Sequence, residues 1–208
     1  MGAYELWSDK YLFGTDNLGR DMLSRLIFGA RNTIGIALAA VIIAFVIGGV
    51  TGMLSAILGG WYDTIISRIV DILMAIPGLV FALLILTILG TSMTTLVLVI
   101  AVLDSTRVYR ITRAAAMNVA VMDFVEVARL RGEGMWWVIR KEILPNIMAP
   151  LLAELGLRFC FVFLFIAALS FLGLGIQLPP AVWGSMVRYH TTLSNHAAIT
   201  PIEPAARH

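Results

Sequence analysis

Charged residues and cysteines are scarce in this 208-residue chain, and each scarcity excludes a class of protein. Only 13% of the residues are charged and 60% are hydrophobic, whereas a soluble domain has about 25% charged and about 45–50% apolar residues. This composition excludes an ordinary soluble enzyme, because a chain of this length cannot hide so much apolar surface. It equally excludes a disordered chain. The single cysteine, Cys160, excludes an intrachain disulfide and a cysteine metal cluster.

Motifs for nucleotide binding and catalysis are also missing. Neither Lys10 nor Lys141 follows a glycine, so the chain has no GxxxxGK[ST] phosphate-binding loop. Ser170 lacks the flanking glycines of a nucleophile elbow. The three histidines all follow residue 189 and do not have the spacing of a metal site. A net charge of +2 is too small for a nucleic-acid-binding protein. We therefore expect no catalytic residue, no metal and no cofactor in this chain.

Long apolar runs are abundant instead, and they predict an all-α membrane protein with a polytopic helical bundle. No charged residue occurs over 32–62 or over 72–103, and about 20 apolar residues suffice to cross a bilayer. We expect spans at about 33–58, 70–90, 93–110 and 147–172. Within the second of these, Pro77-Gly78 is expected to be a kink that neighbouring helices tolerate. A turn is expected between the first and second spans, at 59–69.

Basic residues predict the orientation of this bundle. Seven of the 15 Lys and Arg residues fall between the third and fourth spans, and cytoplasmic loops carry such an excess. The 104–144 loop and the 59–69 turn are therefore expected in the cytoplasm, and both chain ends outside. The seven residues are Arg107, Arg110, Arg113, Arg129, Arg131, Arg140 and Lys141.

Two features within the expected spans point to helix packing. Small residues recur at four-residue spacing in the first span, which favours close approach of another helix or, alternatively, a wall of a transport path. Glu154 and Arg158 are four residues apart in the fourth span. They either lie near the headgroups or form a pair with a role in substrate movement or gating. The small residues are Ala40, Ala44, Gly48, Gly52 and Ala56.

Amphipathic character is expected in two further segments. Leu18–Arg31 has the pattern of a helix that lies in the membrane surface, or of a solvated helix that packs on the protein. In the cytoplasmic loop, Asp123 is a candidate cap of a short helix that ends at Gly132 and Gly134. Such an exposed helix suits docking of a soluble partner, and the alternative is a helix that lies on lipid.

The loop also carries a recognisable motif. Its residues resemble the EAA loop of binding-protein-dependent ABC import permeases, in which EAA, three residues and glycine precede a Leu-Pro pair at a fixed distance. Here 13 positions separate Gly132 from Pro145, and Val127 stands where the second letter is usually Ala. The matching residues are Glu126, Ala128, Gly132, Leu144, Pro145 and Asn146.

The N-terminal stretch narrows the resemblance. It is similar to the GTDxxGRDxxSRxxxGAR signature of the C-type subunit of dipeptide, oligopeptide and nickel permeases, and LSFLGLGIQLPPAVWGSM resembles a later region of the same subfamily. The signature residues are Gly14, Thr15, Asp16, Gly19, Arg20, Asp21, Ser24 and Arg25.

The resemblance implies a function and a set of partners. The chain would be an inner-membrane permease subunit of a bacterial peptide importer with the type I ABC importer fold. Asp123 and the EAA residues would dock on a cytoplasmic ATPase, which would hold the ATP and magnesium. The expected partners are a second homologous permease subunit, two ATPase subunits and an extracytoplasmic substrate-binding protein. The expected domains are an extracytoplasmic segment at 1–31, the permease domain at 32–187 with its coupling loop at 111–146, and an atypical tail at 188–208.

Departures from the family pattern leave alternatives open. Family members have one further helix before the GTD signature and one after the later region, so the resemblance implies six spans where we expect four. A truncated, non-functional remnant is therefore an alternative to a working subunit. A nickel permease is an alternative to a peptide permease. An intramembrane protease is a third, from another class, that no residue spacing supports.

Overall fold

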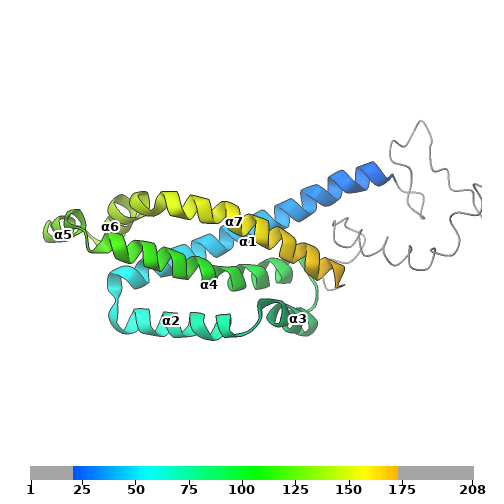
Figure 1. Cartoon of the computed structure of the whole chain (residues 1–208), viewed down its shortest axis with the longest axis horizontal. Coiled ribbons are helices and arrows are strands. Elements are labelled where there is room, and N and C mark those ends of the chain that lie inside the picture. Colours follow the sequence, from blue (N-terminus) through cyan, green and yellow to red (C-terminus); the bar gives the residue numbers. More distant parts are fainter. Residues whose placement is uncertain (1–20, 173–208) are drawn as a thin grey trace, which may run out of the picture. The chain divides into compact units, whose positions relative to one another are not determined.

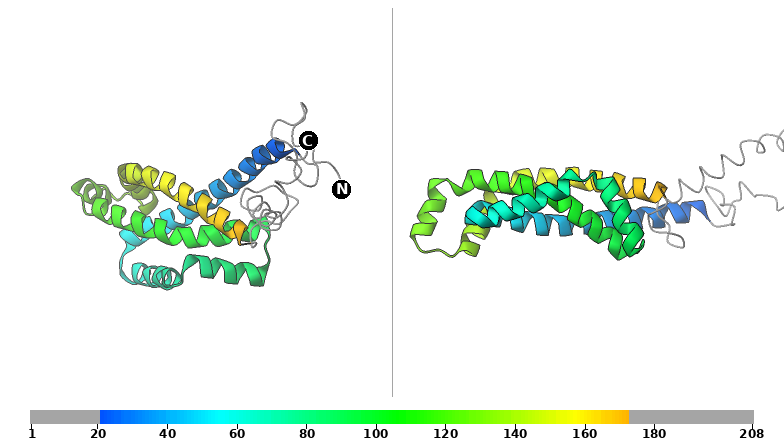
Figure 2. Two further views of the ribbon diagram at one scale, coloured as in Figure 1. Left: turned by 45° about the vertical axis from the view of Figure 1, so that its right-hand side comes forward. Right: turned by 90° about the horizontal axis from the view of Figure 1, so that it is seen from below.

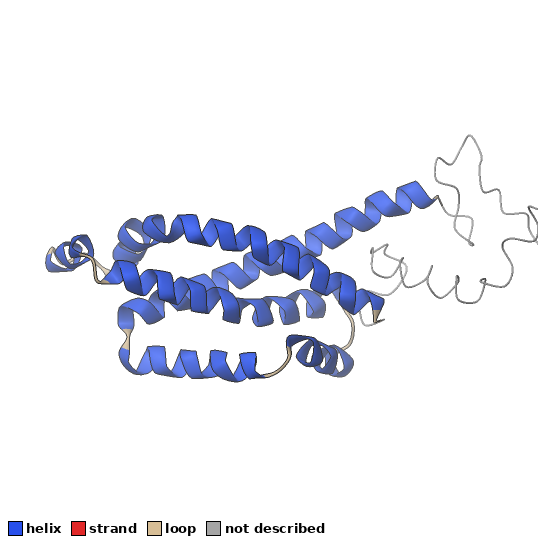
Figure 3. Cartoon of the chain, in the orientation of Figure 1, coloured by secondary structure: helices blue, strands red, loops and turns tan. Residues whose placement is uncertain are grey.

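The computed structural model describes residues 21–172, which form helices joined by short connections (Figure 3). The all-α class expected from the composition is thereby confirmed for this part of the chain. Two compact units are distinguished: one comprises Ile36–Leu164, and the described residues of the other are 21–35 and 165–172. The second unit contains the beginning of α1 (Met22–Leu58) and the last residues of α7 (Leu144–Phe171).

The first helix begins at Asp21, whose carboxylate accepts hydrogen bonds from the backbone N–H groups of Leu23 and Ser24, both at 3.2 Å. This is an N-cap in the usual sense, since it satisfies donors that the first helical turn leaves free. Helix α1 then continues unbroken past Arg31. The expectation of a separate surface helix up to Arg31 is therefore wrong for its described part, because nothing in the sequence stops the helix before the first span.

The stretch Leu23–Leu58 is long and apolar enough to cross a membrane, which confirms the first expected span. It ends where Gly59 and Gly60 adopt positive φ angles of 57° and 55°. Glycine adopts this conformation without the strain that a side chain would cause. The N–H of Gly59 still donates to the carbonyl of Ser55 at 3.1 Å, which closes the last turn.

Two glycines of the small-residue stripe on α1, Gly48 and Gly52, pack against α4 (Met93–Ala120). A Cβ atom on Gly48 would overlap the carbonyl oxygen of Ser105, and one on Gly52 would lie 2.9 Å from the carbonyl oxygen of Tyr109. Only glycine allows the two backbones to approach so closely at these positions. The predicted helix contact is confirmed, and its partner is a helix of the same chain.

The segment after α1 differs from the expected turn and kinked span. It forms α2 (Gly60–Ala75) and α3 (Gly78–Leu89), which are bent by 88° relative to each other. Both helices pack against α4 (Figure 1). Pro77 lacks an N–H and disfavours helical geometry in the residue before it, and Ile76 is accordingly extended. The proline therefore breaks the helix, and the expectation of a tolerated kink is wrong.

Helix α4 is longer than the expected span at 93–110. It begins after a turn at Gly90, whose φ is 85°, and Ser92 caps it by accepting a hydrogen bond from the N–H of Thr95 at 3.1 Å. The helix continues to Ala120, so Arg107, Arg110 and Arg113 lie on it. The expectation that these three arginines belong to a loop from residue 104 is wrong, because a charged side chain does not end a helix.

The remaining chain returns through the short helices α5 (Asp123–Leu130) and α6 (Met135–Val138), a π-helical turn η1 (Ile139–Ile143) and α7. Figure 2 shows α5 and α6 at the ends of α4 and α7. The wide turn η1 ends two residues before Pro145, which has no N–H to donate to the carbonyl four residues earlier.

The described helices account for the expected spans in part. By length and composition, Leu23–Leu58 and Met135–Phe171 are candidate spans, and the bent pair of α2 and α3 is a third if it counts as one. Helix α4 carries three charged residues among its first 18 and does not meet the same criterion. The first and fourth expected spans are thus confirmed, and the crossing by α4 stays a prediction.

Candidate functional site

The helix α5 is the central element of the loop between α4 and α7. Its N-cap is Met122, whose carbonyl accepts the N–H of Val125 at 2.9 Å, so Asp123 is the first helical residue and not the cap. Asp123 and Glu126 both lie in the first turn, where the helix dipole favours negative charge.

The other end of α5 is closed by a glycine, as expected. Gly132 has a φ of 81°. Its N–H donates to the carbonyl of Arg129 at 2.9 Å, and the N–H of Glu133 donates to that of Ala128 at 3.2 Å. Together these bonds form a C-terminal cap that requires a left-handed residue. Gly134 has an ordinary φ of −68° and serves as the N-cap of α6.

One face of α5 is anchored in the bundle. Val125 and Ala128 are fully buried. They belong to a hydrophobic cluster that also includes residues of α1, α4, η1 and α7. Because this cluster joins the short helix to the ends of the long helices, α5 is fixed relative to them. Its other buried members are Met53, Ala116, Val119, Val138, Ile139, Ile143, Ile147 and Leu151.

Other residues of the loop expose large apolar side chains. Val121 is 84% exposed and Leu130 is 80% exposed. Exposed apolar side chains in such number are typical of surfaces that contact another protein or a membrane. The exposed apolar residues include Val121, Met122, Phe124, Val127, Leu130 and Trp136.

The residues of the EAA pattern divide between buried and exposed positions. Glu126 and Gly132 are exposed, whereas Ala128 is buried. Leu144 packs on the same hydrophobic cluster as Ala128, and Pro145 is exposed at the beginning of α7. The Asn146 side chain donates to the carbonyl of Glu142 and so holds the turn before α7. Alanine and leucine of the pattern thus secure the loop, while glutamate and glycine face outward.

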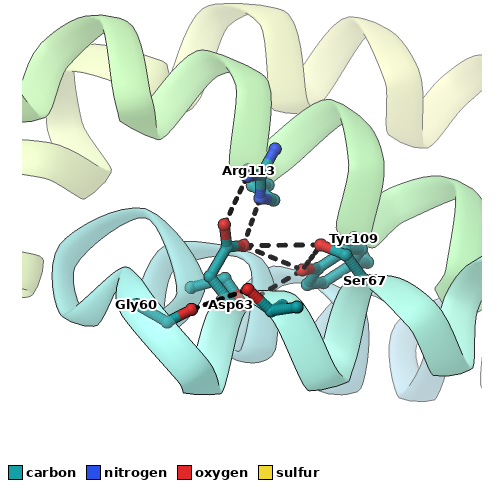
Figure 4. Close-up of polar contacts among 7 residues, drawn as sticks. Gly60, Asp63, Ser67, Tyr109 and Arg113 are labelled. Carbon is teal, nitrogen blue, oxygen red and sulfur yellow. Dashed lines mark hydrogen bonds and ion pairs between the residues drawn. The ribbon is translucent and has the colours of Figure 1, made fainter.

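A polar network that joins α1, α2 and α4 was not predicted from the sequence. The Asp63 carboxylate of α2 forms a two-pronged ion pair with the Arg113 guanidinium of α4 (Figure 4). The Tyr109 hydroxyl lies 3.4 Å from Asp63 Oδ1, 2.9 Å from Ser67 Oγ and 3.1 Å from Ser55 Oγ. We name these five residues the α1–α2–α4 clamp, since they tie the three helices together two turns before α4 ends.

One signal in the sequence pointed to this clamp. Asp63 is the first charged residue after a run of 31 uncharged ones. Tyr109 and Arg113 are four residues apart, which places them on one face of a helix. Sequence spacing cannot show that these two features meet, because 50 residues separate the charges.

A family model described as the inner membrane component of binding-protein-dependent transport systems matches residues 48–202. The match covers most of the chain, including the whole α4–α7 loop. The chain belongs to this family.

Several curated relatives agree with this assignment. The di/tripeptide transport system permease protein DppC of Pseudomonas aeruginosa is 41% identical over 178 residues, which are 86% of this chain and 59% of the relative. The probable D,D-dipeptide transport system permease protein DdpC of Escherichia coli is 39% identical over 180 residues, covering 86% and 60%. DppC of Haemophilus influenzae is 37% identical over 184 residues, covering 88% and 62%. The chain thus spans about 60% of the length of these relatives.

Family membership confirms the resemblance drawn from the EAA and GTD residues. Together with the candidate spans, it makes the chain a multi-pass protein of the inner membrane with the permease fold. The names of the relatives are those of transport permeases, in agreement with the expectation of a subunit that is not an enzyme.

The GTD signature lies mostly outside the described residues, which begin after Arg20. Asp21 caps α1, as described above, and Ser24 and Arg25 are half-buried in its first turns. These three residues belong to the unit that does not contain the loop. Among residues 21–172, no group of three or more His, Cys, Asp or Glu side chains is placed to hold a metal ion.

Proposed function

We propose that this chain is a permease subunit of an ABC importer for peptides, and that separate ATPase subunits dock on its α5 helix. The observation that carries the proposal is a contrast within the loop: α5 is anchored through Val125 and Ala128, whereas large apolar side chains of the same loop are exposed. We name these exposed residues the docking face; it comprises Val121, Met122, Phe124, Val127, Leu130 and Trp136. The names of the relatives, which are peptide transport permeases, support the cargo class.

The anchoring supplies a route for mechanical coupling. A force on the docking face would act on Val125 and Ala128, which pack with Ile139 and Ile143. Interiors are close-packed and deform little, so the ends of α4 and α7 would move with α5. The α1–α2–α4 clamp would carry the same motion to α2 through Asp63. ATP-driven closure of the ATPases would in this way switch the permease between its inward- and outward-facing states.

The proposal includes the other parts of the transporter. A second, homologous permease subunit would complete the pathway, two ATPases would hold ATP and magnesium, and an extracytoplasmic binding protein would deliver the peptide. Glu126 and Gly132 are exposed on the loop and would contribute to the ATPase contact. Asp123 would contribute its charge at the helix N-terminus. Ala128, Leu144, Pro145 and Asn146 would hold the loop in place.

The test is co-purification with an ATPase that binds ATP but does not hydrolyse it. We expect Leu130→Asp to reduce recovery of the ATPase at least about tenfold, since it puts a charge into a desolvated apolar contact. Asn118→Asp is the matched control: Asn118 is exposed on α4 near the loop, and the change adds the same charge outside the docking face. It should leave recovery unchanged.

The co-purification has three informative outcomes. Loss with Leu130→Asp alone supports docking on α5. Equal recovery of both variants overturns it. No association of the unaltered chain under any nucleotide condition also overturns it. Gly132→Asp is a poorer probe, because the positive φ of Gly132 makes any side chain there strained.

A further inference from the structure

Three charged side chains meet between the middles of α4 and α7. Arg158 on α7 pairs with Glu154 one turn earlier, and its Nη1 also lies 3.7 Å from Oδ1 of Asp104 on α4. All three side chains are mostly buried, and Asp104 is only 3% exposed. Charges within membrane helices are rare and mark functional sites. The α7 pair begins ten residues into its helix, so the reading that places it near headgroups is not favoured.

The two carboxylate oxygens of Asp104 have different surroundings. Arg107 and Arg158 both approach Oδ1, at 3.6 Å and 3.7 Å, which is beyond hydrogen-bonding distance. Within residues 21–172, Oδ2 is buried and has no hydrogen-bond partner. A buried acceptor without a donor is unfavourable, and natural proteins seldom keep one without a purpose.

The most buried side chains of this site carry more negative than positive charge. Asp104, Glu154 and Arg158 hold two carboxylates and one guanidinium, whereas the side chain of Arg107, the second guanidinium near Oδ1, is 52% exposed. Arg158 cannot turn to serve Oδ2 without losing other contacts, since it bonds Glu154 and lies over the Phe161 ring at 5.4 Å.

We propose that Asp104 Oδ2 binds the ammonium group of the cargo as it passes through the permease. A primary ammonium supplies the hydrogen-bond donor that Oδ2 lacks, and its positive charge suits a site with two mostly buried carboxylates. Glu154 adds negative potential at the same place, and Arg158 holds the two carboxylates together. The inference rests on the proposed function, because a peptide carries such a group at its N-terminus.

A proton on Asp104 would also remove the charge, so the experiment must separate cargo binding from protonation. Asp104→Asn has the same shape as the protonated carboxyl and lacks the charge. If Asp104 is only a protonated structural group, this variant should transport as well as the unaltered protein. If Asp104 binds an ammonium, the variant should transport a dipeptide only as fast as the unaltered protein transports a cargo without the amine.

The experiment is a two-by-two cycle in proteoliposomes that contain the complete transporter. Uptake of a dipeptide and of its des-amino analogue is measured with each permease, at concentrations that saturate the isolated binding protein. We expect Asp104→Asn and loss of the amine each to lower the maximal rate about tenfold, which is typical of a hydrogen bond to a charged group. Combined, the two changes should lower it no further, because both remove the same interaction.

Additive losses, or an unchanged rate with Asp104→Asn, would overturn the proposal. Asp71→Asn is the matched control, since Asp71 is an exposed carboxylate on α2, and it should behave as the unaltered protein. If the unaltered transporter takes up no dipeptide, the proposed function fails. That result differs from additive losses, which overturn only the proposal for Asp104.

A second measurement needs no variant and so does not depend on correct folding of one. A dipeptide with a photoreactive diazirine in its first side chain is irradiated with the unaltered transporter during turnover. We expect labelled fragments that contain residues 99–108 or 154–161, and excess unlabelled dipeptide should compete with labelling. Labelling of neither segment would overturn the assignment of this site to cargo.

Discussion

Two ion pairs join α4 to its neighbours, and they differ in how well their polar atoms are satisfied. In the α1–α2–α4 clamp, both oxygens of Asp63 meet Arg113, and Tyr109 adds a hydroxyl shared with two serines. Asp104, half-way along the same helix, has two arginines near one oxygen and none at the other. The clamp is a completed network of the kind that rigidifies a fold. The Asp104 site is incomplete, which is why we assign it to binding.

Removal of the positive charge from the incomplete site should have the largest effect on stability. Arg158→Leu leaves the Glu154 carboxylate without Arg158, and Asp104 with the half-exposed Arg107 at 3.6 Å. An uncompensated buried charge destabilises a protein by about 3–5 kcal/mol. We expect a lower thermal midpoint for the reconstituted protein and loss of much of the folded chain.

The control for this effect restores neutrality without restoring the arginine. Adding Asp104→Asn and Glu154→Gln to Arg158→Leu should recover most of the midpoint, since the triple variant buries no charge. If the triple variant is as unstable as the single one, the loss comes from packing around Phe161 and not from electrostatics.

The corresponding change in the clamp should have a smaller effect. Arg113→Met leaves Asp63 with Tyr109 and Ser67, and the ion pair is partly exposed, so we expect a loss of about 1 kcal/mol. The thermal midpoint of the same reconstituted protein measures it. With Asp63→Asn already present, Arg113→Met should have little further effect. A loss as large as that of Arg158→Leu would contradict the difference between the two sites.

The accuracy of the sequence-based prediction varied along the helices for physical reasons. Gly48 and Gly52 were predicted to form a helix contact, because four-residue spacing places them on one face whatever the partner. The short helix before Gly132 is also predicted from local signals, although its cap is Met122 and not Asp123. The loop faces could be anticipated only in outline, because burial of Ala128 depends on residues of η1 and α7.

Angles between helices and contacts between distant residues cannot be predicted from local sequence patterns. The 88° bend at Pro77 was expected as a kink, because the sequence shows a missing donor but not how neighbours accommodate it. The extent of α4 was underestimated, since Arg110 and Arg113 look like the end of a span when their partners are unknown. Asp104 was overlooked for the same reason: its partner Arg158 lies 54 residues away.

The smallest expected effect concerns the hydroxyl at the centre of the clamp. Tyr109→Phe removes contacts to Ser55 and Ser67 while the ring stays in its buried place, so the loss should be about 0.5–1 kcal/mol. The thermal midpoint measures it, and Tyr62→Phe is the matched control at a half-buried tyrosine of α2. If the five residues act as one network, Tyr109→Phe should cost less stability when Asp63→Asn is already present, because Tyr109 and Asp63 are coupled. Independent effects would mean that Tyr109 stabilises α1 alone, and that the clamp consists of two separate contacts.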